Sequence, residues 1–197
     1  MRNPEATKEK ILKHSGTLFN TQGYKATSIS DITKATGFTK GAIYRHFKNK
    51  DVLEIETLTH LSSAMFDQLR DRIKAKRTAP LKLKAVFAYF ETYVGKPAVK
   101  GGCPLMNVAI EADDAHPALR KRAISILNML RDSIITILEN GIRYGQIRRG
   151  IDKAHIASVI IASLEGAIMM SKLRGNGDDI KSVNRHLEAL VDGITAQ

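Results

Sequence analysis

The sequence is poor in the features on which secreted and membrane proteins depend. It has one cysteine, Cys103, among 197 residues, which excludes an internal disulfide framework and a metal site built from several cysteines. No apolar run approaches the roughly 18 residues that a membrane-spanning helix needs, and the first ten residues hold no apolar signal-peptide core. We therefore expect a cytoplasmic protein without a membrane partner.

The short motifs that mark common active sites are also absent. The six histidines are scattered, without the spacing of a metal-binding pair. There is no Gly-x-Ser-x-Gly sequence of a hydrolase, no P-loop and no Gly-x-Gly-x-x-Gly dinucleotide-binding turn. We expect no catalytic residues, no metal and no cofactor, and hence a protein that is not an enzyme.

Helical spacing of apolar residues extends along most of the chain, and strand-like alternation is nearly absent. Asn, Ser, Thr and Asp precede the apolar segments as helix caps, and Gly and Pro separate them. The pattern predicts an all-α fold of about nine helices, at about residues 4–22, 28–36, 39–47, 49–76, 78–94, 104–112, 117–144, 152–173 and 179–194.

Positive charge is concentrated at the start of the chain. The net charge is +11. Residues 1–50 hold ten Lys or Arg against three Asp or Glu, a net charge of +7, which leaves +4 for the other 147 residues. Such a segment suits the phosphates of DNA, although a solvated basic face has the same composition. The shift in composition predicts a basic three-helix domain at 1–48 and a helical body at 49–197.

Two short helices separated by a turn with Gly37 are typical of a helix-turn-helix. Gly37 permits the tight bend because glycine adopts positive φ freely. The apolar positions expected on the packed side are Ile29, Ile32, Ala35, Ile43 and Phe47. The other side of the second helix could then face the major groove of DNA. An ordinary helical hairpin with an incidental glycine is the alternative.

The run GYKATSISDITKATGFTKGAIYRHFKNKDVL, residues 23–53, is more specific than a generic helix-turn-helix. It has a Gly-Tyr pair at 23–24, a Thr-Gly-Phe-Thr-Lys-Gly turn at 36–41 and a Tyr-x-His-Phe sequence at 44–47. In these features it resembles the N-terminal domain of the TetR family of repressors, over about residues 7–58. The resemblance implies a helix-turn-helix domain followed by a helical domain that binds an effector and dimerises.

DNA contacts follow from the resemblance, position by position. It implies phosphate contacts from Thr27, Tyr44, His46 and Lys50, a DNA contact at the helix-capping Ser28, and a cap at Thr39 that aims the second helix at a phosphate. Base edges would be read by Lys40, Gly41, Ala42 and Arg45. Of these, lysine and arginine can donate to guanine acceptors, and alanine could contact a thymine methyl.

The resemblance also implies a homodimer, paired through the last two helices, on a palindromic operator in double-stranded DNA. A small-molecule effector among the middle helices would move the helix at 49–76 and change the spacing of the two DNA-reading helices. The lining residues expected from the sequence are Met65, Phe66, Leu69, Phe87, Phe90, Tyr93, Cys103, Met106, Ile110 and Met129. For each of these, ordinary core packing is the commoner role.

Two features leave alternatives open. Glu111, Asp113 and Asp114 form an acidic cluster that could suit a cationic effector or be a solvated helix end. Cys103 precedes a helix and could sense oxidants or electrophiles, or be an inert buried thiol. We expect a repressor released by an effector. The alternatives are an activator of the same fold and a helical ligand-binding or interaction protein that does not use DNA.

Overall fold

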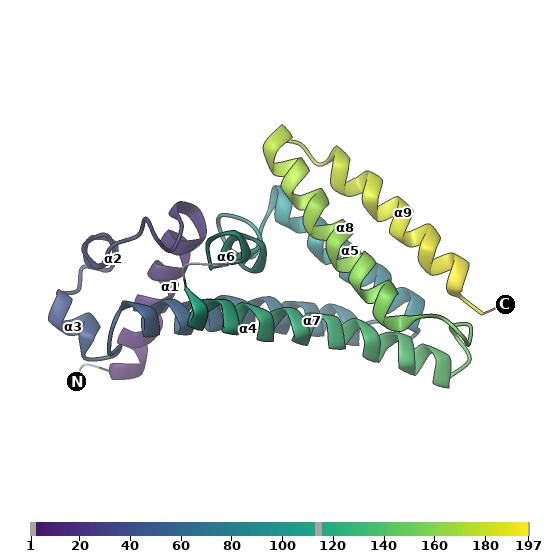
Figure 1. Cartoon of the computed structure of the whole chain (residues 1–197), viewed down its shortest axis with the longest axis horizontal. Coiled ribbons are helices and arrows are strands. Elements are labelled where there is room, and N and C mark those ends of the chain that lie inside the picture. Colours follow the sequence, from purple (N-terminus) through teal and green to yellow (C-terminus); the bar gives the residue numbers. More distant parts are fainter. Residues whose placement is uncertain (1–2, 113–115, 197) are drawn as a thin grey trace. The chain divides into compact units, whose positions relative to one another are not determined.

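The computed structural model describes residues 3–112 and 116–196. These residues form nine helices and no strand, which confirms the predicted fold class (Figure 1). The helices are α1 (Pro4–Gln22), α2 (Ile29–Thr36), α3 (Lys40–Tyr44), α4 (Lys50–Lys74), α5 (Ala79–Gly95), α6 (Pro104–Ala112), α7 (Pro117–Arg143), α8 (Lys153–Arg174) and α9 (Asp178–Ile194).

The chain divides into two compact units. The first is Met1–Ala64 with Val99–Ile126, and the second is Met65–Ala98 with Leu127–Gln197. Two helices, α4 and α7, therefore contribute their first parts to the first unit and their second parts to the second. The boundary predicted at residue 48 falls inside the first unit, because α6 and the beginnings of α4 and α7 belong to the same compact unit as α1–α3. The assignment of residues 1–48 to DNA binding and of residues 49–197 to effector binding and dimerisation remains a prediction.

Side-chain caps fix the helix ends of the first unit, as the sequence predicts. Asn3 accepts hydrogen bonds from the backbone N–H groups of Glu5 and Ala6 at the start of α1. Ser28 and Asp31 form a reciprocal capping box at α2, and Asn49 accepts from the N–H of Val52 at α4. Because each bond satisfies a donor that a helix start leaves unpaired, these starts are fixed locally.

The loop before α6 is fastened to the end of α1. The side-chain amide of Asn20 donates to the carbonyl oxygens of Lys100 (2.8 Å) and Gly102 (2.9 Å). The amide of Asn107 donates in turn to the side-chain oxygen of Asn20 at 2.9 Å. Gly101 has φ +103, and a Cβ there would collide with the backbone carbonyl oxygen of Asn20. The contact therefore requires glycine.

Glu111, at the end of α6, also forms a contact inside the first unit. Its carboxylate accepts the backbone N–H of Lys25 at 3.2 Å and lies where a side chain on Gly23 would have to go. This carboxylate is therefore engaged with the protein, against the idea that it serves a cationic effector. Asp113 and Asp114 lie outside the described residues.

In the second unit, α8 packs against α5 and α9. Gly141 of α7 leaves room for Ala79 and Ile147, since a Cβ there would lie 2.7 and 2.5 Å from their side chains. The α7–α8 turn caps α5 through Gln146, whose side-chain oxygen accepts the N–H of Ala79 at 2.7 Å. Thr78, the residue before α5, makes no side-chain hydrogen bond there.

The turn between α7 and α8 is also hydrogen-bonded to the end of α9. The N–H of Arg148 donates to the carbonyl of Ile194 (2.9 Å), and that of Ala196 donates to the carbonyl of Gln146 (3.1 Å). The end of α7, the start of α5 and the end of α9 are thus held together by backbone and amide hydrogen bonds.

The sequence analysis predicts no apolar segment of membrane-spanning length, and one helix contradicts that prediction. Among the described residues α8 is long and apolar enough to cross a membrane by length and composition alone. However, 44% of its apolar window is buried inside the protein, and a core helix of a soluble protein passes the same test. Its packing against α5 and α9 is the better account of its composition.

Substitution of Gly101 tests the fastening of the loop to α1. We expect Gly101→Ala to lower the free energy of unfolding by about 2–5 kcal/mol, because it adds a steric clash to the strain of a positive φ. Gly145→Ala is the matched control: Gly145 also has a positive φ (+67), but a Cβ there would meet nothing within 4 Å, so it should cost about 1 kcal/mol. Urea unfolding followed by circular dichroism measures both, and equal losses would contradict the clash.

Candidate nucleic-acid interface

The turn between α2 and α3 is built by local geometry. Gly37 ends α2 in the left-handed region at φ +73, and its N–H donates to the carbonyl of Thr33 at 2.9 Å. Thr39 then caps α3, because its hydroxyl accepts the N–H of Ala42 at 3.2 Å. The α3 helix ends at Tyr44, earlier than predicted, although the N–H of Phe47 still donates to the carbonyl of Ile43 at 3.1 Å.

Asp31 fixes the start of α2 electrostatically. The Ser28 hydroxyl donates to its carboxylate at 2.6 Å and the Ser28 backbone N–H at 2.9 Å. These two hydrogen bonds, with a smaller effect of the Lys34 charge, lower the pKa of the exposed Asp31 carboxyl below its ordinary value of 3.8. A depressed pKa means that the cap stabilises the fold above that value and loses its effect as the pH falls through the lower folded-state pKa. The cap is therefore intact at neutral pH.

The packed side of the motif is largely as predicted. Ile32, Ile43 and Phe47 are buried, and Ile29 is half-buried. Ala35 was expected on this side, but it is exposed. Because α2 has only eight residues, the helical spacing of its apolar residues could not show whether Ala35 lies at the edge of the packed face or in solvent.

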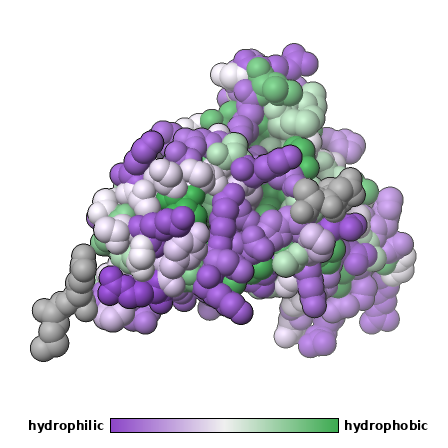
Figure 2. Space-filling view, turned by 60° about the vertical axis from the view of Figure 1, so that its left-hand side comes forward, coloured by the Kyte–Doolittle hydropathy of each residue, from purple (hydrophilic) through white to green (hydrophobic). Residues whose placement is uncertain are grey.

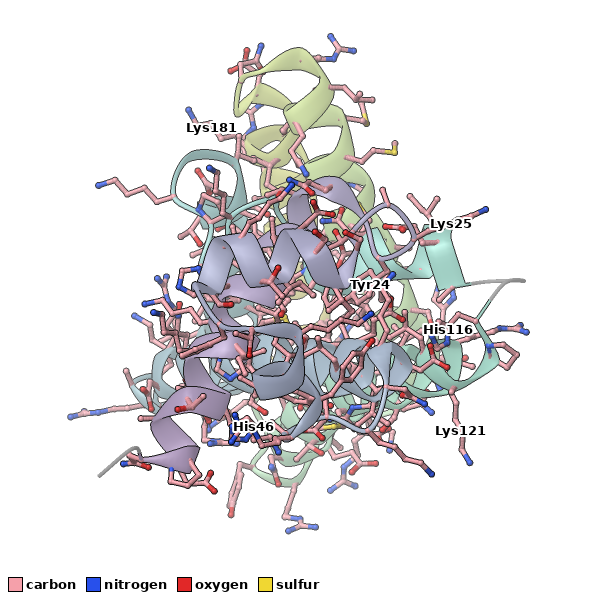
Figure 3. All side chains as sticks on the ribbon, turned by 90° about the vertical axis from the view of Figure 1, so that its left-hand side faces the viewer. Tyr24, Lys25, His46, His116, Lys121 and Lys181 are labelled. Atoms are coloured by element: carbon pink, nitrogen blue, oxygen red, sulfur yellow. The ribbon has the colours of Figure 1, made fainter. Side chains whose placement is uncertain are left out.

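The opposite side is exposed and basic. Lys40, Tyr44 and Arg45 are exposed, as are the caps Ser28 and Thr39, and His46 is half-exposed. The Lys40 ammonium lies 5.8 Å from the centre of the Tyr44 ring, a distance at which the cation and the ring attract each other. A Cβ on Gly41 would meet nothing within 4 Å. The side is thus open to a partner, and Figure 3 labels His46 on this unit.

Two of the expected contact residues face inward. Thr27 is fully buried, and its hydroxyl donates to the carbonyl of Gly23 at 2.7 Å. It therefore has neither the exposure nor a free donor for a phosphate. Ala42 is 9% exposed and belongs to the core with Ile43, so it does not present a methyl group to a thymine. We correct both assignments.

Lys50 has partners inside the protein. Its ammonium donates to the carbonyl of Tyr24 at 2.7 Å and lies 3.1 Å from the carboxylate of Glu54, which is almost completely buried. Burial of the Tyr24 ring, followed by the charges of Glu54 and Glu111, raises the pKa of its hydroxyl well above the ordinary value of 10.0. The hydroxyl therefore stays neutral. The predicted phosphate contact of Lys50 would have to compete with these two partners.

Asp51, Glu54 and His116 form the one cluster among the described residues that has the composition of a metal site, with ligand atoms within 4.8 Å of one another. His116 Nδ1 accepts the backbone N–H of Leu119 at 3.2 Å, so the ring proton sits on Nε2. That nitrogen lies 2.9 Å from a Glu54 carboxylate oxygen. Since a metal would need the Nε2 lone pair, the geometry fits a structural contact between the imidazole and the Glu54 carboxylate better than a metal centre.

The expected effector-lining residues separate between the two units. Phe66, Leu69 and Met129 line one groove of the second unit, and Phe90 lines a small void there with Leu130, Ile134, Ile161, Leu164 and Glu165. Met65, Phe87 and Tyr93 are buried in the core of that unit. Cys103, Met106 and Ile110 belong to the first unit, where Cys103 is fully buried. Ile110 is 78% exposed, so its assignment as a lining residue is wrong.

A short helix that presents basic side chains, braced by a second helix and followed by a helical body, defines a DNA-binding transcriptional regulator. Residues 11–56 match the family described as bacterial regulatory proteins of the tetR family, and residues 79–187 match the tetracyclin repressor-like C-terminal domain. The chain belongs to the TetR family, whose members are ligand-responsive regulators that dimerise, not enzymes.

Individual relatives agree over most of their length. The HTH-type transcriptional regulator YxaF of Bacillus subtilis is 34% identical over 84% of both chains. The fatty acid metabolism regulator protein of the same organism is 26% identical over 87% of both. Among solved structures, a TetR transcriptional regulator from Chloroflexus aurantiacus superposes with a TM-score of 0.95 and 32% identity, covering 100% of this chain and 99% of that one.

The contacts of Lys50 generate a stability prediction. We expect Lys50→Ala to lower the free energy of unfolding by about 1–3 kcal/mol, because the nearly buried Glu54 carboxylate loses its cation. Lys48 is exposed, so Lys48→Ala should change the free energy of unfolding by less than about 0.5 kcal/mol. Urea unfolding of both variants makes the comparison. If the two were equally stable, the bonds to Tyr24 and Glu54 would contribute nothing.

Proposed function

We propose that this protein is a repressor that binds a palindromic operator as a homodimer and leaves it when a small effector binds. Such a protein would act in the cytoplasm, where it meets the DNA. The observation that carries the proposal is the exposed face of α3, with Lys40, Tyr44 and Arg45 outward and Gly41 uncovered. Relatives named as repressors, such as KstR2 of Mycolicibacterium smegmatis at 33% identity over 76% of this chain, support it.

Two kinds of contact are assigned on this face. Arg45 and Lys40 are the proposed readers of guanine edges, with Gly41 allowing the helix to approach the bases. Tyr44, His46 and the capped start of α3 at Thr39 are the proposed phosphate contacts, together with Lys50 if it releases an internal partner. Ser28 contributes as the cap of α2. A gel shift on the protein's own upstream DNA, repeated over a series of salt concentrations, tests the whole proposal.

Saturable, sequence-dependent retardation in that assay would support the repressor. Retardation of every DNA alike would indicate a basic binding module, and no retardation would overturn the proposal.

Arg45 and Lys48 distinguish base reading from phosphate binding. We expect Arg45→Ala to cost about 1–3 kcal/mol of operator binding and to relax the preference at one base pair, because a bidentate donor to guanine is lost. Lys48 is exposed directly after the motif and is proposed as a further phosphate contact, so Lys48→Ala should weaken binding to all sequences and reduce the salt slope by about one phosphate, without changing the preferred site. Binding-site selection and salt titration provide the two readouts. An unchanged preferred sequence for Arg45→Ala would remove it as a reader.

The proposed dimer interface is the outer face of α8 together with α9. Side chains at helical spacing on α8 are apolar or small and at least partly exposed: Ala162, Gly166, Met169, Met170 and Leu173. The space-filling view shows apolar atoms at its upper tip, where Figure 1 places the end of α8 (Figure 2). A Cβ on Gly166 would meet nothing within 4 Å, so the single chain leaves this part of the face uncovered. Burial against a second copy would remove the apolar stripe from water.

Gly166→Arg tests that interface. The larger side chain fits the isolated chain and raises helix propensity by about 1 kcal/mol, so the fold should persist while the dimer dissociates. Gly95→Arg is the control, because Gly95 also has open space around its Cβ position and lies on α5. Sedimentation should give a monomer for the first variant and a dimer for the second. A dimer for both would contradict the interface on α8.

A further inference from the structure

The second unit contains a groove that the DNA-binding role leaves unexplained. It is formed by the second half of α4, the start of α5, the second half of α7 and Gln146 of the following turn. Its volume is about 900 Å³, within the range of roughly 300–1,000 Å³ of small-molecule sites in proteins. All of its lining residues belong to the second unit.

The charges around the groove are mostly of one sign. Arg70, Lys74, Arg77 and Lys82 line it, against the single carboxylate of Asp132. Arg70 is paired with Asp67, which lies 2.8 Å away on the same helix. No ion pair is recorded within the described ranges for Lys74, Arg77 or Lys82. Three cations thus face one acid, which leaves the groove with excess positive charge that attracts an anion.

The floor of the groove is apolar. Leu69 and Ile137 form part of it and are almost completely buried in the core, and Phe66 and Ile73 are half-buried beside them. Met129 adds a side chain that is 47% exposed at the edge. The partly exposed side chains of Phe66, Ile73 and Met129 leave apolar surface in water, and covering it with a hydrocarbon chain gains free energy. A purely ionic ligand such as phosphate would leave that gain unused.

One end of the groove is held rigidly. Gln146 lines it and at the same time accepts the N–H of Ala79, a second lining residue. Gly141 lets α7 approach Ala79 and Ile147 closely. Because these contacts lie within the chain itself, they preorganise this end of the groove, which favours affinity.

From the cations above an apolar floor we propose that this groove binds an amphipathic anion, a molecule with a hydrocarbon chain and a carboxylate or phosphate head. The chain lies along Phe66, Ile73 and Met129, and the head lies at Lys74, Arg77 and Lys82. The ligand chemistry is opposite in sign to the cationic effector that the acidic cluster at 111–114 suggested.

Its identification as the effector rests on the proposed repressor function, whereas binding itself does not. The α4 helix that supplies Lys74 to the groove runs unbroken to Lys50, which bonds the carbonyl of Tyr24. A ligand in the groove therefore contacts the same helix that is fastened to the helix-turn-helix.

Titration calorimetry on the full chain tests the binding, with probes kept below the concentrations at which they form micelles. Dodecanoate and monododecyl phosphate supply the two heads on one chain, and dodecyltrimethylammonium supplies the same chain with a positive head. Decanoate and inorganic phosphate test the contributions of chain length and of charge alone. We expect dodecanoate to bind about ten-fold more tightly than decanoate, because two further methylenes are buried. The cationic probe and inorganic phosphate should not bind measurably.

Charge-removing variants locate the site. Lys74→Gln combined with Arg77→Gln should weaken dodecanoate binding about ten-fold or more, since charge-assisted hydrogen bonds to the head are lost. Lys121→Gln combined with Lys181→Gln removes the same charge at two exposed positions outside the groove, both labelled in Figure 3, and should leave the affinity within about two-fold.

The outcomes separate the two proposals. Equal affinity for the cationic and anionic chains, an equal effect of both double variants, or binding only as micelles would overturn the groove assignment. The preferred head identifies the ligand's source as a carboxylate or a phosphate ester. The gel shift is read independently: binding of dodecanoate without operator release removes the effector role alone, and failure of all DNA binding removes the repressor while the calorimetry still decides the groove.

Discussion

The ammonium of Lys50 holds the junction on which the DNA-binding unit depends. It lies at the first turn of α4, where it bonds the carbonyl of Tyr24 and the carboxylate of Glu54. Tyr24 belongs to the segment between α1 and α2, and its ring stacks on Phe19 of α1 at 4.8 Å. One cation thus joins the chain before the helix-turn-helix to the helix after it. The segment before α2 and the first turns of α4 are thereby tied to one side chain.

Local chemistry explains which parts of the fold could be predicted from the sequence. Caps such as Asn3, Ser28 and Asn49 act within three residues of themselves, so residue type and spacing were sufficient. The burial of Thr27 and Ala42 was missed because it depends on how α1, α2 and α3 pack together. The capping of α5 by Gln146 was also missed, since Gln146 is 67 positions away in the sequence from Ala79, whose N–H it accepts.

The distribution of charge in space also depends on contacts between residues far apart in the sequence, so the sequence alone did not predict it. The sequence places most of the net positive charge before residue 50, and that signal pointed to DNA. The cations of the groove are spread over α4, the following loop and α5, and nearby acids such as Asp67 and Asp71 mask them in any count along the chain. Only the folded second unit places Lys74, Arg77 and Lys82 around one apolar floor. A small net charge over a long segment therefore does not exclude a strongly basic site.

The helical glycines divide into two groups with different physical reasons. At Gly16 and Gly141 a Cβ would lie 2.7 Å or less from side chains of Leu61 and Ile147, so the packing of the single chain requires glycine. At Gly41, Gly95, Gly166 and Gly193 a Cβ would meet nothing within 4 Å, although glycine costs about 1 kcal/mol of helix propensity in a helix interior. The single chain gains nothing from that cost. The proposed function would account for two of these positions: DNA would approach Gly41, where the neighbouring side chains are basic, and a second copy would approach Gly166, where they are apolar.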